Sequence, residues 1–142
     1  MAFAHGSAGF FNLDNSGGTP TDLSSYTREV NFAPEVQIHD TSVFGVGSRS
    51  KTIGLKDGKV TVTFMNDPTL QTHLINLWTT QTPGGGQTFT FSYGPQGSTT
   101  GKRRITGECI LAGFPVDAKV DDVETIQAAL EVTGNVTYDT FP

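Results

Sequence analysis

Residues 122–138 read DVETIQAALEVTGNVTY, and from Ile126 onward every second residue of this stretch is apolar or small. The residues between them, from Gln127 to Thr137, are almost all polar. Successive side chains of a β-strand point to opposite sides, so this alternation predicts a strand with one buried face and one solvated face. The stretch therefore places a β-sheet at the centre of the fold.

The same stretch also carries helical signals. Asp121-x-x-Glu124 imitates a capping box, and the run Ala128–Glu131 favours a helix. Helical spacing, however, would place Gln127 beside Leu130 and so mix polar and apolar side chains on one face. The second half of the stretch is rich in β-forming residues, and we therefore interpret the whole as a strand.

The predicted strand is unusually long. It runs for about 14 residues, where an average strand has five or six, and it would extend roughly 45 Å at ~3.3 Å per residue. Its outer face carries threonine, glutamine and asparagine with little charge. A small domain has little use for such a strand unless the polar face lines something.

The composition indicates one β-rich domain. The chain has 142 residues, 35% of them hydrophobic, and 17 glycines, and this length suffices to bury one core. A single cysteine, Cys109, excludes an internal disulfide and lies in the apolar phase of a predicted strand, so we expect a buried, inert thiol. No apolar run approaches the ~20 residues of a membrane helix, and no basic-then-apolar signal opens the chain, so we expect no membrane partner.

The net charge of −5 argues against a dedicated nucleic-acid-binding protein, because such proteins need a basic face. The bases nevertheless cluster: four lie between residues 49 and 59, and three lie between residues 102 and 104. Such clusters are either solvated loop ends or one half of a charge-complementary contact with a neighbouring copy.

We divide the chain into an N-terminal arm, residues 1–25, and a single β domain, residues 26–142. The N-terminal arm carries phenylalanines without a clear period, which need something to pack against. In the domain, Tyr26–Phe32 alternates as a strand, Pro34 marks a break, and a second short strand follows. About seven strands and one helix account for the periodic segments.

The helix is predicted over residues 67–81. Asp67 is placed to cap it, and Pro68 sits at the first helical position, where its missing N–H costs nothing. Large apolar residues recur at helical spacing and predict one stripe that covers the sheet, formed by Leu70, Leu74, Leu77 and Trp78.

Residues 40–58 are predicted to form an extended loop. The span shows no clear period and is far longer than the median connection of about five residues. It mixes glycines, bases and apolar residues, a content that favours a docking loop over a disordered one. The candidate interface residues are Phe44, Val46, Arg49, Lys51, Ile53, Leu55 and Lys56.

No local motif for catalysis, cofactor binding or metal binding occurs in the sequence. The three histidines lack partners at a zinc-like spacing, the aspartates near residue 120 lack the EF-hand pattern, and Pro83–Gly86 lacks the lysine of a phosphate loop. We therefore expect no catalytic residues, no cofactor, no metal and no enzymatic activity.

Several short segments follow one another in a recognisable order: DLSSY at 22–26, TSVFG at 41–45, KTIGLKDG at 51–58, NDP at 66–68, FSYGPQG at 91–97 and TGNV at 133–136. Their order and spacing, over roughly residues 20–141, resemble those of the tail tube (major tail) proteins of long-tailed bacteriophages. The resemblance implies a mainly β fold, a β-sandwich or half-barrel of about seven strands with one flanking α-helix and a long inter-subunit loop.

The resemblance also implies a structural virion protein that self-assembles into hexameric rings, stacked as the tube through which DNA leaves the capsid. The polar face of the last strand would line the bore, with Gln127, Glu131, Thr133 and Asn135 as lumen-facing candidates. Few cations there would keep DNA weakly held, because fixed lysine or arginine binds phosphates. By resemblance, the loop over 40–58 reaches between subunits or rings and brings its bases to acids on adjacent copies.

The partners implied are other copies of the chain, the tape measure protein, the tail terminator and tip proteins, and double-stranded DNA in passage. The implied location is the virion tail, after synthesis in the host cytoplasm. The alternative is a virion-associated binding module, either a jelly-roll carbohydrate binder or a capsid decoration protein. Aromatic residues support that alternative, but Trp78 is predicted to lie in the core stripe of the helix rather than on an exposed platform.

Overall fold

The computed structural model describes residues 9–45, 47–117, 120 and 124–142. Within these ranges the chain forms eight antiparallel strands and one α-helix. In chain order the elements are β1 (Phe10–Asp14), β2 (Pro20–Asp22), β3 (Thr27–Asp40), β4 (Lys51–Met65), α1 (Pro68–Thr80), β5 (Phe89–Gly94), β6 (Arg103–Gly113), β7 (Val116–Asp117) and β8 (Thr125–Thr140).

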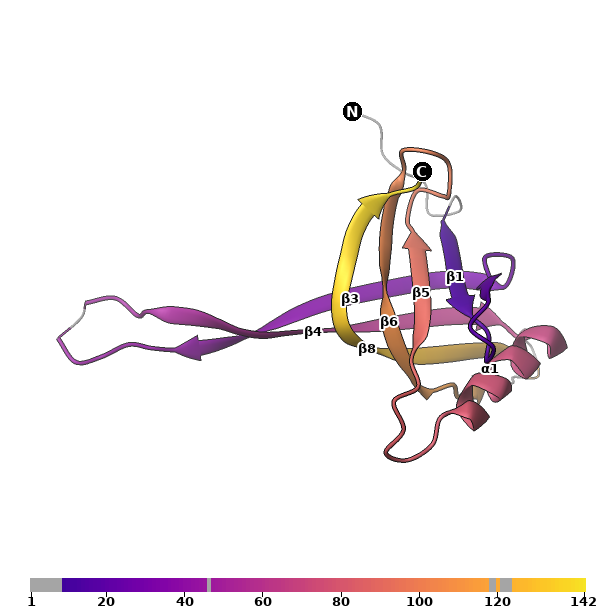
Figure 1. Ribbon diagram of the computed structural model, residues 1–142, viewed down its shortest axis with the longest axis horizontal. Coiled ribbons are helices and arrows are strands. Elements are labelled where there is room, and N and C mark those ends of the chain that lie inside the picture. The colour runs from indigo at the N-terminus through magenta and orange to yellow at the C-terminus, as the bar shows by residue number, and fades with distance from the viewer. Residues whose placement is uncertain (1–8, 46, 118–119, 121–123) are drawn as a thin grey trace.

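All the strands belong to one curved sheet. The order is β2-β1-β5-β6-β8-β4-β3, with the short β7 added to β8. Figure 1 shows β1, β5 and β6 running side by side, while β3 and β4 cross them at a steep angle. The two end strands, β2 and β3, are not neighbours in this order, so the sheet stays open. The predicted mainly β fold with one helix is confirmed, and its shape is that of a half-barrel.

β8 lies between β6 and β4 in the sheet and so connects the group β1, β5 and β6 to the crossing strands β3 and β4. Its first part, up to Glu131, pairs with β4, while β6 pairs with it along most of its length. The β6–β8 register shifts where Thr106 and Glu108 face Thr137 and Thr133, and Gly134 adopts a φ of 80° at this point. A glycine tolerates this backbone conformation without steric cost, so β8 can bend there and change direction. The long final strand expected from the sequence is confirmed, with 16 residues.

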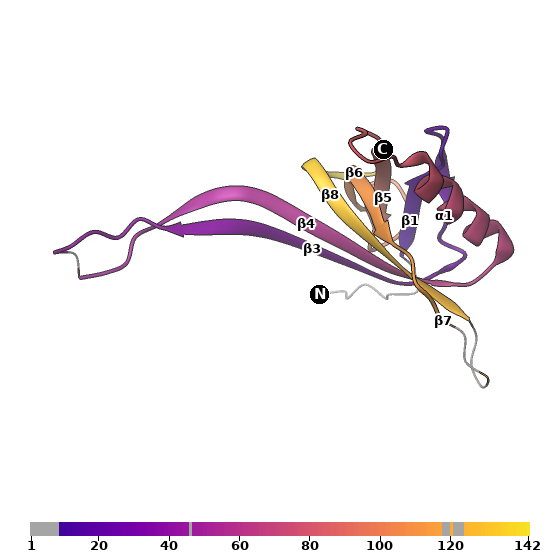
Figure 2. The same cartoon turned by 90° about the horizontal axis from the view of Figure 1, so that it is seen from below.

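The core lies between the folded halves of the sheet and the helix. β4 and β8 contribute alternate residues to it, and α1 closes it with three leucines. The residues that the sheet and helix bury here include Val60, Val62, Phe64, Leu70, Leu74, Leu77, Phe91, Leu111, Ile126 and Leu130. Asp67 caps α1 by accepting a hydrogen bond from the Thr69 N–H at 2.9 Å. Figure 2 shows α1 beside β1, at the side of the molecule opposite to the projecting end of the β3–β4 hairpin.

The boundary drawn between an N-terminal arm and the domain at residue 25 is wrong for the described part of that segment. β1 and β2 are strands of the sheet, and Phe11, Leu13 and Leu23 are buried in the core. The five residues of β1 are too few to display a period that stands out from their surroundings. Residues 1–8 lie outside the described ranges.

The prediction of an extended loop over residues 40–58 is also wrong in its bounds. β3 continues to Asp40 and β4 begins at Lys51, so only residues 41–50 connect them. The break expected at Pro34 is absent, because Pro34 faces Gly58 inside a continuous ladder. β3 is the last strand of the sheet, and on a free edge the missing N–H of proline leaves no partner unsatisfied.

The helix matches its predicted span closely, but its apolar stripe is narrower than expected. Leu70, Leu74 and Leu77 are buried, whereas Trp78 is 49% exposed. The indole packs edge-on against Phe114, with 5.8 Å between ring centroids. Trp78 therefore lies at the rim of the helix contact rather than in the core stripe.

Candidate functional site: the hairpin arm and the groove at its base

The most unusual feature of the molecule is the part of the β3–β4 hairpin that projects from the sheet. β4 pairs with β8 only from Lys59 onward, so residues 35–57 form a two-stranded extension that we call the hairpin arm. Figure 1 shows it leaving the body of the molecule as a long ribbon. None of its described residues is buried. An isolated two-stranded hairpin is only marginally stable in water, so we expect the hairpin arm to pack against another molecule.

Large apolar side chains lie exposed along the hairpin arm. Ile38 and Ile53 face each other across the two strands, and Ile53 is 73% exposed. Phe44, in the connection between the strands, is fully exposed, and Val36 and Leu55 are also exposed. Val46 lies outside the described residues. Exposed apolar surface of this kind is typical of a protein–protein contact.

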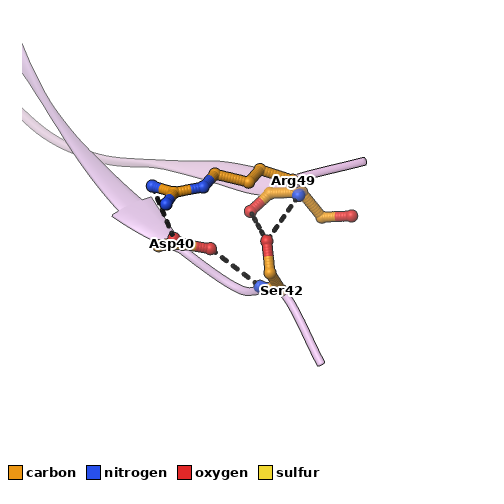
Figure 3. A network of polar contacts seen from close by, with 4 residues as sticks. Asp40, Ser42 and Arg49 are labelled. Carbon is orange, nitrogen blue, oxygen red and sulfur yellow. Dashed lines mark hydrogen bonds and ion pairs between the residues drawn. The ribbon is translucent and has the colours of Figure 1, made fainter. Parts of the chain in front are cut away.

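Polar contacts order the end of the hairpin arm, as Figure 3 shows for Asp40, Ser42 and Arg49. The Asp40 carboxylate accepts a hydrogen bond from the Ser42 N–H at 2.9 Å and lies 3.9 Å from the Arg49 guanidinium. The Ser42 hydroxyl oxygen accepts a hydrogen bond from the Ser50 N–H at 2.8 Å and so ties the two strand ends together. Hydrogen bonding by the side chain and the backbone N–H of Ser42 lowers the pKa of Asp40.

The bases of this region divide into two groups. Arg49 lies beside Asp40, and the ammonium of Lys59 lies 3.9 Å from Glu131. Both therefore have an acid within their own chain. Among the described residues, Lys51 and Lys56 form no ion pair.

The outward face of β8 carries three of the four residues predicted to face a bore. Gln127 lies opposite Thr63, Glu131 opposite Lys59, and Thr133 opposite Glu108 on β6. The residues that alternate with them, such as Ile126 and Leu130, are buried. The predicted alternation therefore holds over this half of the strand, and Gln127, Glu131 and Thr133 share its polar side.

Asn135 is placed differently. It follows Gly134 at the register shift, where no residue of β6 is paired with it. Its side of the strand therefore does not follow from the alternation upstream. Asn135 instead lines a groove that also includes Lys56, one of the predicted interface residues.

This groove lies at the base of the hairpin arm, between the arm and the second half of β8. Its volume is about 410 Å³. Apolar side chains form much of its wall, and three charged residues, Glu35, Lys56 and Asp57, complete it. The apolar residues are Phe32, Val36, Val132, Val136 and Tyr138. No sequence pattern indicated that Glu35, Asp57 and Tyr138 line one groove, since only the strand register brings them to one place.

The titratable groups buried elsewhere do not form a reactive site. Burial raises the pKa of the Cys109 thiol to about 12. The thiol donates a hydrogen bond to the Phe89 carbonyl oxygen, with 3.3 Å between the sulfur and the oxygen. The prediction that this thiol is buried is thus confirmed. Burial lowers the pKa of His73 on α1. Within the part of the chain that the structure describes, no group of three or more metal-ligating side chains occurs.

The described part of the chain holds no helix that is both long and apolar enough to cross a membrane.

No protein-family model matches the chain, and no curated protein matches it. Solved structures do match. A chain in the tail of an empty gene transfer agent particle with C6 symmetry superposes with a TM-score of 0.76 at 9% identity, over 97% of this chain and 100% of the other. A chain of the SPP1 tail tube gives a TM-score of 0.75 at 11% identity, over 97% and 80%.

A chain of the anti-feeding prophage baseplate, with 6-fold symmetry, gives a TM-score of 0.64 at 11% identity, over 99% of this chain and 96% of the other. The chain therefore has the fold found in these tail structures along nearly its whole length. The resemblance to tail tube proteins noted in the sequence is confirmed at the level of the fold.

Proposed function

We propose that this protein is a structural subunit of a virion tail, which self-assembles into hexameric rings stacked as a tail tube for the passage of DNA. The observation that carries the proposal is the hairpin arm, whose exposed apolar residues no single copy can bury. The fold adds support, because similar chains occur in a tail with C6 symmetry and in a tail tube. In this proposal the protein is made in the host cytoplasm and has no enzymatic role.

The polar face of β8 and its neighbours lines the bore. Gln127 and Thr133 are uncharged, and Glu131 offsets the nearby cation of Lys59. DNA phosphates bind to unpaired lysine and arginine and release counterions, so a face without free cations holds DNA weakly. Asn135 follows the bend at Gly134 and lines the groove at the base of the hairpin arm, so it is not part of this alternating polar face.

The hairpin arm forms the contacts between subunits or rings. Apolar residues on it become buried against a neighbouring copy, and its bases add charge complementarity that steers the encounter. The contact residues are Phe44, Val46, Arg49, Lys51, Ile53, Leu55 and Lys56. The tape measure protein inside the tube and the tail terminator and tip proteins at its ends complete the partners.

Electron microscopy tests the proposal directly. Negatively stained, concentrated protein is expected to form rings or tubes of constant diameter. A variant in which Asn-Gly replaces residues 37–55 joins the paired Val36 and Lys56 through a two-residue hairpin loop. We expect it to keep the far-UV circular dichroism and unfolding midpoint of the parent protein, because none of the described residues that it removes is buried. It should form no tubes.

A parent protein that stays monomeric at every concentration, even with tail initiator components added, would contradict the proposal. Tubes formed equally well by the shortened variant would contradict the role of the hairpin arm. Binding of a monomer to a glycan array, lost in Trp78→Ala, would favour the carbohydrate-binding alternative, which the half-exposed indole of Trp78 makes testable.

A further inference from the structure

A histidine occupies a core-facing position of the helix. His73 lies among Leu70, Leu74 and Leu77 on α1, at the spacing that places all four side chains on the side packed against the sheet. The three leucines are buried, and His73 is half-buried. α1 contains no aspartate, glutamate, lysine or arginine, so His73 is the group of this helix that titrates near neutral pH.

The imidazole of His73 is poorly placed to carry a second proton. Its Nε2 atom is buried and has no hydrogen-bond partner among the described residues. The neutral ring can keep its one proton on the other nitrogen, whereas the protonated ring has an N–H on both. Protonation would therefore bury a charged donor that has no acceptor, which costs folding free energy.

Asp14, the last residue of β1, acts in the opposite direction. Its backbone forms a hydrogen bond with His73, and the charge of its carboxylate favours the protonated ring. The same carboxylate accepts a hydrogen bond from the Thr90 N–H of β5 at 3.4 Å, so His73 does not have it alone. Burial outweighs both contributions of Asp14 and lowers the pKa of His73 below its ordinary value of 6.5.

The other titratable groups near Asp14 add no charge at the ring. Burial raises the pKa of the Cys109 thiol on β6 to about 12, so this thiol is neutral over the range in which histidine titrates. The Glu108 carboxylate, also on β6, accepts a hydrogen bond from the Thr90 hydroxyl at 3.0 Å. Among the described residues, Asp14 is the charged group that shifts the pKa of His73.

We propose that His73 is a pH-sensitive switch that controls how firmly α1 packs on the sheet. The neutral ring packs with the three leucines and keeps the helix over the core, whereas the protonated ring loosens it. All the residues of this switch belong to the body of one copy, so it operates without the hairpin arm and without assembly.

The direction of the response follows from the lowered pKa. Between the folded pKa of His73 and its ordinary value of 6.5, the opened chain binds a proton that the closed chain does not. The stabilisation by the neutral ring is therefore complete above the ordinary value and is lost as the pH falls to the folded pKa. Each pH unit within this window should raise the equilibrium constant for opening by up to about tenfold.

Amide hydrogen exchange of the dilute monomer measures this opening. Between about pH 7.5 and about pH 5.5, the protection of the Leu74 and Leu77 amides should fall by up to about tenfold, after correction for the intrinsic pH dependence of exchange. His73→Gln removes the titrating group and should make the protection independent of pH. His39→Gln removes an exposed histidine of the hairpin arm, and this matched control should respond as the parent does.

An NMR titration of the imidazole gives a readout that needs no variant, so the test remains valid if His73→Gln does not fold. The parent should titrate below the ordinary value of 6.5. Asp14→Asn keeps an oxygen acceptor for the Thr90 N–H but removes the carboxylate charge. We expect it to lower the pKa of His73 further, because this charge favours the protonated ring.

Three results would overturn the inference: a parent His73 that titrates at or above 6.5, protection of α1 that acid does not change, or a pH response that His39→Gln abolishes and His73→Gln keeps. None of them concerns assembly, so tubes formed by the parent protein would still support the proposed function. A parent protein that never assembles would contradict the proposed function, and the switch would still be measured in the monomer.

Discussion

The two halves of β4 have similar apolar residues and opposite surroundings. Val60, Val62 and Phe64 are fully buried, whereas Ile53 and Leu55 on the same strand are largely exposed. The difference is the neighbouring strand: β8 covers the second half of β4 and leaves the first half free. The body of the molecule therefore completes its own core, while the hairpin arm has surface that only another molecule can cover.

The largest effect on stability is expected when one large side chain is removed from the body of the molecule and, in a second variant, one from the hairpin arm. Phe91→Ala takes a fully buried ring out of the core and should cost about 3–5 kcal/mol of unfolding free energy. Ile53→Ala, its counterpart on the hairpin arm, should change that free energy by less than about 0.5 kcal/mol, because the side chain is exposed in one copy. Urea unfolding of the dilute monomer measures both.

A similar cost for the two substitutions would mean that the hairpin arm packs on its own body in solution. The effect of Ile53→Ala on assembly should be large even though its effect on stability is small. Ile53→Ala should weaken tube formation while leaving the fold unchanged, as expected for a residue buried only between copies.

A finer test compares two aspartates that make the same local contact. Asp67 and Asp40 each accept a hydrogen bond from the backbone N–H two residues ahead, at 2.9 Å in both cases. Asp67→Ala removes a helix cap and should lower the unfolding free energy by about 1 kcal/mol. Asp67→Asn, which keeps an oxygen acceptor for the cap, should retain most of the unfolding free energy that Asp67→Ala loses. Asp40→Ala should leave the unfolding midpoint unchanged, because the end of the hairpin arm supports no core.

Thermal or urea unfolding of these three variants gives the comparison. A loss with Asp40→Ala equal to that of Asp67→Ala would show that the hairpin arm and the body unfold as one unit.

The smallest expected effect is the response of the hairpin arm to pH. Hydrogen bonding by Ser42 lowers the pKa of Asp40, so the ionised carboxylate is favoured in the folded chain. Its contribution is present above the ordinary value of about 3.9 and is lost as the pH falls through the lowered folded pKa. Titration of the side-chain carboxyl by NMR should place the pKa of Asp40 below its ordinary value, and Ser42→Ala should raise it.

The body should keep its amide spectrum over the same pH range in which the signals of residues near Asp40 shift. An Asp40 that titrates at the ordinary value in the parent protein would show that the contacts at the end of the hairpin arm do not persist in solution.

Local pattern was a reliable guide where one face of an element is buried. The alternation in β8 and the cap and leucines of α1 each repeat within a few residues, and they predicted both elements correctly. Pattern failed where both faces are exposed, because residues 40–58 then have no period to display. It also left β1 in the N-terminal arm, because its two core residues, Phe11 and Leu13, are too few to tie the segment to the domain.

The candidate site shows the same division. Sequence reasoning selected Lys51, Ile53 and Lys56 from their composition, and it selected Gln127, Glu131 and Thr133 from their alternation. It did not select Glu35 and Asp57, which lie more than twenty residues apart along the chain and meet only through the β3–β4 register. Nor did it indicate that Lys59 lies opposite Glu131, which only the β4–β8 register shows.

The sequence alone determined that this protein is built on a long amphipathic strand and has one capped helix, since each of these features follows from a period within one segment. Only the tertiary structure decided where β8 leaves β4, and with it the open edge, the groove and the hairpin arm. The physical reason is that strand register and the bend at Gly134 depend on pairing between segments far apart in the chain. Such pairing has no signature in the residues of either segment taken alone.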